Sequence, residues 1–201
     1  MKRSPILFLV EVALFSALGA VLSLPYLSIP LWLQGGSISF AMVPILFMAF
    51  RWGLKGGLLS GLLIGFFNSV LDPFIVHPVQ YVLDYPVAFF VVGFAGIFSS
   101  AVKNAVTNGN VKRFTMYLTL GAFVGCTLRF LSHFASGIIF IDYFMPDGVP
   151  GSVWMYSLTY NIGYMLPSFI ISAIVLSILL YKQPRFLHVE SKHANRTVHS
   201  N

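Results

Sequence analysis

The chain of 201 residues is 57% hydrophobic and 16% aromatic, and only 9% of its residues are charged. A soluble globule of this length needs more polar surface than this composition supplies, so the sequence predicts an integral membrane protein. The single cysteine, Cys126, excludes an internal disulfide, and the chain has no CxxC, zinc-ligand or haem-attachment spacing. We therefore expect neither redox chemistry nor a cofactor.

Apolar segments recur along the chain, and a helix needs roughly 20 apolar residues to cross a bilayer. The pattern predicts an all-α polytopic membrane protein with a single six-helix bundle in residues 1–182 and a polar cytoplasmic tail in residues 183–201. Glu11 interrupts the first apolar segment, so we interpret it as a retained helix and not as a signal peptide. We expect helices near residues 6–24, 38–50, 54–72, 79–101, 115–141 and 154–181.

The distribution of basic residues predicts the orientation of this bundle. Apart from Arg129, the Lys and Arg residues, eleven of the 12, fall on one side of it. The opposite side holds Asp72, Asp142 and Asp147 but no Lys or Arg. Both termini are therefore expected in the cytoplasm, and the net charge of +6 reflects topology and not a nucleic-acid partner.

Asp84 lies inside the apolar run "HPVQYVLDYPVAFFVVGFAG" of residues 77–96. A charged residue at the bilayer centre costs about 3 kcal/mol or more, so such residues usually face a bundle interior or a watery cavity. Asp84 is therefore the first candidate for a functional residue, although a structural ion pair with Arg129 is the alternative. Arg129 is equally open to a role in orienting Asp84 or His133, which lies one helical turn away on the same face. Pro86 predicts a helix distortion beside it.

Three polar residues on three predicted helices share one depth. At a rise of about 1.5 Å per residue, Asp84, His133 and Asn161 lie roughly 7, 12 and 10 Å from the predicted outer ends of their helices. A pocket with a carboxylate, an imidazole, a carboxamide and aromatic rings suits a small, flat, cationic heterocycle. Three more side chains are candidates for the same pocket: Gln80 one turn above Asp84, Tyr156 above Asn161, and Trp154 on the face of Asn161. For Trp154, anchoring at the membrane interface is the alternative.

Small residues recur at four-residue spacing on two predicted helices. Gly53, Gly57, Gly61 and Gly65 form a smooth face that favours close helix packing. Ala13 and Ala17 form an AxxxA motif, which suits either internal packing or docking of another membrane protein.

The motifs of an energy source and of common hydrolases are absent from the sequence. It has no GxxxxGK[ST] loop for ATP hydrolysis, and no GxSxG or HExxH motif. Any active transport must therefore take its energy from another protein. A secondary transporter would be expected to have inverted repeats, and none is visible.

Five stretches together carry a family resemblance over about residues 6–182. In combination they resemble the substrate-binding S component of energy-coupling factor vitamin transporters, in the thiamine-specific, Bacillus-like branch. The stretches are "EVALFSALGAVLS", "QGGSISFAMVPILFMAFRWGLKGGLLSGLLIG", "HPVQYVLDYPVAF", "LRFLSHFASGIIF" and "WMYSLTYNIGYMLPSFI".

The resemblance implies thiamine as the ligand and assigns its binding positions. It puts Asp84 at the acidic position that faces thiamine and Tyr85 at the neighbouring aromatic position. It matches His133, Tyr156 and Asn161 to further binding positions. It also implies a lid formed by the outer loop 25–37.

The resemblance also implies partners and a location. Ala13 and Ala17 match the family's docking groove for a transmembrane T subunit, which works with two ATP-binding cassette ATPases. The protein is thus expected in the bacterial cell membrane, as a substrate-capture subunit and not an enzyme.

This sequence departs from the family pattern near the expected ligand. Ser39 stands where an acidic residue is usual, Ile141 replaces a Trp, and "QGGS" of residues 34–37 replaces another Trp. We expect Ser39 to face the ligand, with Gln34, Trp32 or Trp154 as substitutes for the missing residues. Another heterocycle, such as a hydroxymethylpyrimidine or riboflavin, stays open as the ligand, as do a stand-alone facilitator and an intramembrane enzyme.

Overall fold

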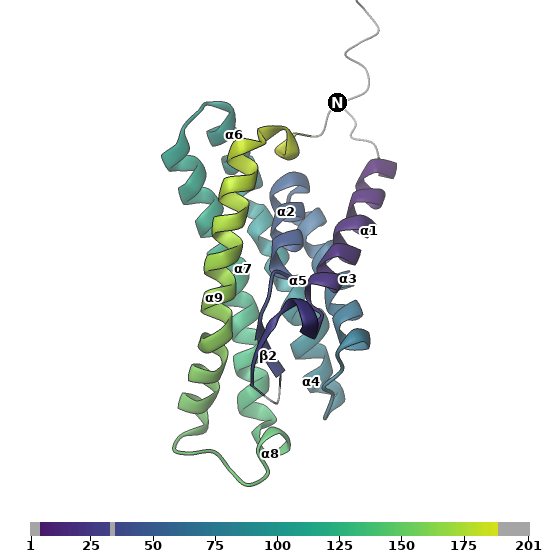
Figure 1. The fold of residues 1–201 in the computed structure, drawn as a ribbon, viewed down its shortest axis with the longest axis vertical. Helices are drawn as coiled ribbons and strands as arrows, with labels where there is room; N and C mark the ends of the chain where they lie inside the picture. Colours follow the sequence, from purple (N-terminus) through teal and green to yellow (C-terminus); the bar gives the residue numbers. More distant parts are fainter. Residues whose placement is uncertain (1–4, 33–34, 189–201) are drawn as a thin grey trace, which may run out of the picture.

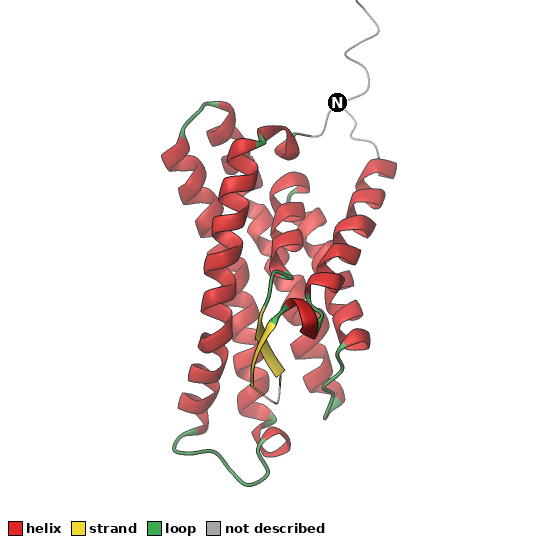
Figure 2. Cartoon of the chain, in the orientation of Figure 1, coloured by secondary structure: helices red, strands yellow, loops and turns green. Residues whose placement is uncertain are grey.

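The structure is a computed structural model, and it describes residues 5–32 and 35–188. These residues form an elongated bundle of helices (Figures 1 and 2). Five helical segments are long and apolar enough to cross a membrane: Pro5–Leu22, Leu54–Leu71, Pro78–Thr107, Val111–Ile139 and Val153–Lys182. The chain is thus a helical membrane protein, as its composition predicts.

In the described residues, the bundle comprises five single helices and one composite segment. The long single helices are α1 (Pro5–Leu22), α3 (Leu54–Leu71), α7 (Val111–Ile139) and α9 (Val153–Lys182), and α2 (Met42–Trp52) is shorter. The remaining span is composite, with α4 (Pro78–Val82), η2 (Leu83–Val87), α5 (Ala88–Val92), η3 (Gly93–Phe98) and α6 (Ser99–Thr107). Short turns are η1 (Pro25–Leu27), α8 (Ile141–Phe144) and η4 (Pro184–Leu187).

The connection between α1 and α2 contains two strands that the sequence analysis did not anticipate. β1 (Ile29–Trp32) pairs antiparallel with β2 (Gly35–Ile38), and Ile29 lies opposite Ile38. Gly36 has a φ of 75°, which a residue with a side chain rarely adopts. Because residues 35–38 are extended, α2 begins at Met42 and not near residue 38. Gln34 lies outside the described residues.

The composite span is distorted where Pro86 interrupts it. Residues Leu83–Val87 form a π-helical turn, because a proline ring cannot donate the backbone hydrogen bond that an α-helix requires. From α7, Ser132 Oγ donates to the carbonyl of Leu83 at 2.6 Å. The distortion expected beside Asp84 is thus present, and it is held by a neighbouring helix.

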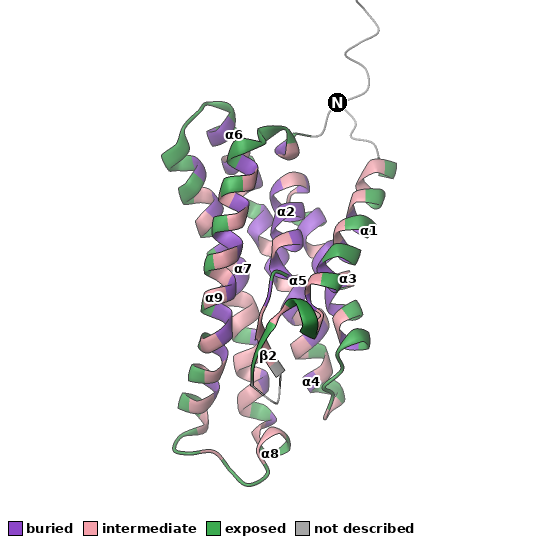
Figure 3. Cartoon of the chain, viewed as in Figure 1, coloured by how far each residue is buried: buried purple, intermediate pink, exposed green. Residues whose placement is uncertain are grey.

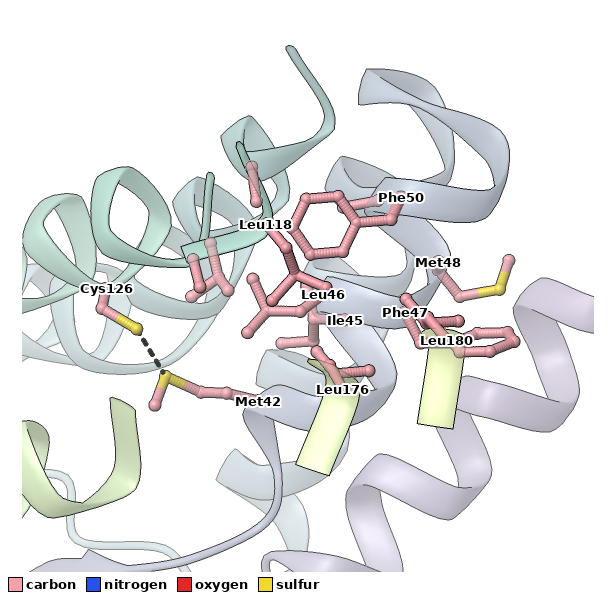
Figure 4. Packing of buried hydrophobic residues seen from close by; sticks show 14 of the residues in the cluster. Met42, Ile45, Leu46, Phe47, Met48, Phe50, Leu118, Cys126, Leu176 and Leu180 are labelled. Atoms are coloured by element: carbon pink, nitrogen blue, oxygen red, sulfur yellow. Dashed lines mark hydrogen bonds between the residues drawn. The ribbon is translucent and has the colours of Figure 1, made fainter. Parts of the chain in front are cut away.

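The core is built around α2, which is surrounded by other elements. Nine of its 11 residues are buried, so it needs no polar face. Figure 4 shows its side chains packed between residues of α7 and α9, and Cys126 Sγ lies 3.6 Å from Met42 Sδ. Figure 3 shows that exposed residues lie mostly on the outer faces of the surrounding helices, as expected in a lipid environment.

The glycine-rich face of α3 allows close backbone contact with the composite span, as its spacing predicts. A Cβ atom on Gly65 would lie 2.5 Å from the carbonyl oxygen of Tyr85, and one on Gly61 would overlap the carbonyl oxygen of Phe89. Any side chain larger than hydrogen would push the π-helical turn away from α3.

The described chain ends lie at one end of the bundle (Figure 1). Glu11 forms an ion pair with Arg51 there, and Arg51 Nη1 donates to the carbonyl of Phe186 at 2.6 Å. Leu187 is fully buried. The first residues of the expected polar tail therefore form the anchored turn η4, and residues 189–201 lie outside the described part.

Candidate functional site

A cavity of about 380 Å³ lies in the half of the bundle that contains α4, α8 and the hairpin. Its walls come from α3, the composite span, α7, α9 and the connection between α1 and α2. This volume falls in the range of small-molecule sites, about 300–1,000 Å³. The predicted site residues that line it are Ser39, Gln80, Asp84, Tyr85, His133, Tyr156 and Asn161.

Asp84 is the centre of a polar network in this cavity. Its Oδ2 accepts hydrogen bonds from Gln80 Nε2 at 2.7 Å and from Ser136 Oγ at 2.8 Å. Its Oδ1 lies 3.0 Å from His133 Nδ1. Three side chains from two helices therefore hold the carboxylate in one orientation, at the π-helical turn.

Arg129 contacts this network through His133. Its Nε donates to His133 Nε2 at 3.4 Å, and its guanidinium carbon lies 4.1 Å from the centre of the Phe89 ring. Because a guanidinium can only donate, Nε2 must be the acceptor and the imidazole proton lies on Nδ1, facing Asp84. Asp84 thus borders the pocket and is also linked to Arg129, through His133. We call this hydrogen-bonded chain of Arg129, His133 and Asp84 the relay.

Asn161 is held by its own helix. Its Nδ2 donates to the carbonyl of Ser157 at 2.8 Å, and its Oδ1 accepts from the hydroxyl of Tyr164 at 2.7 Å. The side chain is buried but borders the cavity. One lone pair of Oδ1 stays available to a ligand.

A row of tyrosines along α9 lines the cavity. Tyr156 stacks on Tyr160 with ring centres 6.1 Å apart, and Tyr160 meets Tyr164 edge-on at 6.0 Å. Of these three tyrosines, only Tyr156 is among the residues predicted to line the pocket. The cavity reaches deeper along α9 than the sequence predicted, so all three rings border it.

Gln80 and Tyr85 connect Asp84 to the segment between α3 and α4. Gln80 accepts from the Val76 amide and donates to the Phe74 carbonyl, both at 3.1 Å. The Tyr85 hydroxyl accepts from the Phe74 amide at 2.7 Å and donates to the Asp72 carbonyl at 3.1 Å. The polar atoms of Gln80 are thus fully used, which makes it a support for Asp84.

Two other predicted residues differ in their placement. Ser39 lines the cavity, and its backbone amide donates to Ser168 Oγ of α9 at 3.3 Å. Trp154 does not line it, since its side chain is 64% exposed and meets the ring of Phe134 edge-on. It lies in the first turn of α9, too near the helix end to reach the cavity.

Sequence reasoning missed several residues of the site. Ser136 follows His133 by three positions, so helical spacing alone would have placed it on the same face. Phe74 and Phe144 line the cavity near Ile141 and stack with ring centres 5.8 Å apart. Asn68 adds a polar group from α3. Within the described residues, no cluster of His, Cys, Asp and Glu is suited to hold a metal ion.

Ala13 and Ala17 are both exposed on α1. Ala17 also lines a shallow apolar groove of about 230 Å³ between α1 and α3, together with Ala20 and residues near the end of α3. These small side chains do not fill the interior of the bundle. Their exposure argues against internal packing as the role of the AxxxA motif.

Comparison with known proteins identifies the family of the chain. Residues 9–188 match the family described as thiamine transporter protein. The chain belongs to this family. It is 43% identical to thiamine transporter ThiT of Bacillus subtilis (strain 168) over 183 residues, which cover 89% of this chain and 93% of that protein. It is 26% identical to ThiT of Lacticaseibacillus paracasei over 188 residues, with 92% of each chain covered.

Solved structures have the same fold. A structure of ThiT from Listeria monocytogenes superposes with a TM-score of 0.81 at 26% identity, and covers 90% of this chain and 97% of its own. The S component of a bacterial ECF transporter superposes with a TM-score of 0.54 at 20% identity, over 90% of this chain and 97% of its own. The second match concerns the fold alone.

Proposed function

We propose that this protein is the thiamine-binding S component of an ATP-driven energy-coupling factor importer. Membership of the thiamine transporter family supports this, as does the cavity in a helical membrane bundle. It is a transport subunit and not an enzyme. The observation that carries the proposal is the Asp84 carboxylate, which three side chains orient within a cavity of suitable size.

Asp84 offsets the positive charge of the thiazolium ring. A carboxylate in a partly buried cavity is costly unless it is hydrogen-bonded or paired, and Asp84 has its donors before any ligand arrives. A bound cation then adds the Coulombic partner for which the site is already organised. Arg129, the other charge at this depth, is separated from Asp84 by His133 and stacks on Phe89.

The aromatic and polar walls complete the site. The rings of Tyr85 and Tyr156 pack on the heterocycles of thiamine, and His133 and Asn161 offer hydrogen bonds to its pyrimidine or hydroxyethyl end. Ser39 borders the same space. Residues 25–37, which include the hairpin strand β1, form the lid over the cavity.

The bundle crosses the bacterial cell membrane with six helical segments and with both termini in the cytoplasm. In this orientation the cavity opens outward, and the basic residues at the helix ends that flank the α2–α3 and α6–α7 connections face the cytoplasm: Arg51, Lys55, Lys103, Lys112 and Arg113. The sequence contains no P-loop, so ATP hydrolysis belongs to two ATP-binding cassette ATPases, coupled through a T subunit that docks on Ala13 and Ala17.

The test is thiamine binding to the purified protein, measured by isothermal titration calorimetry, for wild type and for Asp84→Asn. This substitution removes the charge with little change in shape. We expect tight binding by the wild type and at least tenfold weaker binding by the variant, which corresponds to about 1.4 kcal/mol. No binding by folded wild-type protein would overturn thiamine as the ligand, and titration with riboflavin and a hydroxymethylpyrimidine would then follow.

A further inference from the structure

Asn68 contributes a carboxamide to a wall of the cavity for which the sequence predicted no polar group. It lies near the end of α3, is half-buried and lines the cavity. Gly65, almost one turn earlier on α3, is in backbone contact with Tyr85. This contact fixes the Asn68 wall beside the π-helical turn that presents Asp84.

The hydrogen-bond partners of the cavity amides set Asn68 apart. Gln80 uses both its oxygen and its nitrogen on Val76, Phe74 and Asp84. Asn161 is bonded to Ser157 and Tyr164. The side chain of Asn68 forms no hydrogen bond with any residue in the described part of the chain. The Asn68 amide borders the cavity and is not committed to a protein partner, so it is available to a ligand.

The backbone of Asn68 has a separate structural role. Its carbonyl accepts a hydrogen bond from the Asp72 amide at 3.0 Å, which closes the last turn of α3. That bond does not involve the side chain. A substitution of the side chain therefore leaves the helix end intact.

The chemistry of a carboxamide indicates which part of the ligand it recognises. It presents an acceptor and a donor side by side, and it pairs with a ring nitrogen next to an exocyclic amine, as Asn does with the edge of adenine. The aminopyrimidine of thiamine has this edge, whereas its thiazolium ring has no such pair. Because Asp84 on the adjacent wall attracts the thiazolium, the carboxamide of Asn68 is available to the other ring.

We propose that Asn68 is a specificity-determining residue that reads the aminopyrimidine edge of the ligand through two hydrogen bonds. The inference rests on the proposed thiamine-binding function. His133 and Asn161 then offer their hydrogen bonds to the hydroxyethyl group or to the remaining nitrogen of the pyrimidine ring.

The experiment compares wild type with Asn68→Leu, which has nearly the same volume but no hydrogen-bonding groups. Each protein is titrated with thiamine and with a thiamine analogue that lacks the exocyclic pyrimidine amine. We expect Asn68→Leu to bind thiamine at least tenfold more weakly than wild type does. For the analogue, the two proteins should differ by less than about threefold, because one of the paired bonds is already missing.

Asn104→Leu, at an exposed position on α6 outside the cavity, is the matched control and should bind both ligands like wild type. The thermal midpoint of the ligand-free proteins should be the same. Equal thiamine binding by wild type and Asn68→Leu would overturn the inference but leave the proposed function intact. An equal loss for both ligands would overturn it as well, since that pattern indicates packing. If wild type itself did not bind thiamine, the proposed function would fail too.

Discussion

His133 lies between Arg129 and Asp84 and makes a hydrogen bond to each. Its Nε2 accepts from the Arg129 guanidinium at 3.4 Å, and its Nδ1 lies 3.0 Å from the Asp84 carboxylate. The arginine therefore selects the imidazole tautomer that donates to Asp84. Of the two roles that the sequence leaves open for Arg129, this contact favours orientation of His133 over a direct ion pair with Asp84.

Arg129→Met should weaken thiamine binding about tenfold, because His133 then loses the donor that fixes its tautomer and orientation. Nitrogen-15 NMR of the imidazole reports this directly. We expect the Nδ1–H form in wild type and a mixture of tautomers in the variant. Arg129→Lys, which can still donate, is the control and should keep most of the affinity. An unchanged tautomer in Arg129→Met would contradict the relay.

Ser136→Ala should weaken thiamine binding about tenfold as well. It removes one of the donors to Asp84 Oδ2, and a hydrogen bond to a charged group contributes about 1.5 kcal/mol or more. Thr119→Val is the matched control, since it removes a hydroxyl from the same helix at a position that does not line the cavity. Calorimetry should show a clearly smaller change for the control, and similar losses in the two variants would argue against a specific role of Ser136.

The bundle and the centre of its site follow from the sequence, while the finer elements do not. Hydropathy locates the helical segments, and a constant rise per residue brings Asp84, His133 and Asn161 to one depth. The hairpin is different, because strands of four residues that contain Pro30, Gly35 and Gly36 have the composition of a loop. Only the tertiary contact with the rest of the bundle distinguishes these strands from a loop.

Side-chain partners are also beyond sequence patterns. A serine in a membrane helix commonly bonds to its own backbone, so nothing in the local sequence distinguishes Ser136, which bonds to Asp84, from Ser60, which bonds to the carbonyl of Gly56. Trp154 has the correct helical face relative to Asn161, but it lies beyond the end of the cavity. To predict whether Trp154 lines the cavity, both its depth and its helical face must be known, and the sequence spacing indicates only the face.

Gly65→Ala should destabilise the protein by about 1–3 kcal/mol, because the added methyl group meets the rigid carbonyl of Tyr85. Thiamine binding should weaken too, since the displaced turn carries Asp84. Val70→Ile is the control, because it adds one methyl group to a side chain of the same helix that is 64% exposed. Thermal unfolding in detergent measures the stability of both variants. Equal midpoints for Gly65→Ala and wild type would show that α3 and the turn adjust without cost.

Ala13→Trp should abolish association with the T subunit and leave thiamine binding unchanged. Ala13 is exposed on α1, and its small side chain permits close approach of a partner helix, which an indole ring would prevent. Ile174→Trp places the same ring on an exposed apolar site of α9, where 54% of the isoleucine is accessible, and should not affect assembly. Co-purification with the T subunit and the two ATPases measures the outcome. A complete complex with Ala13→Trp would mean that docking uses another face of the bundle, whereas its loss together with thiamine binding would indicate misfolding of α1.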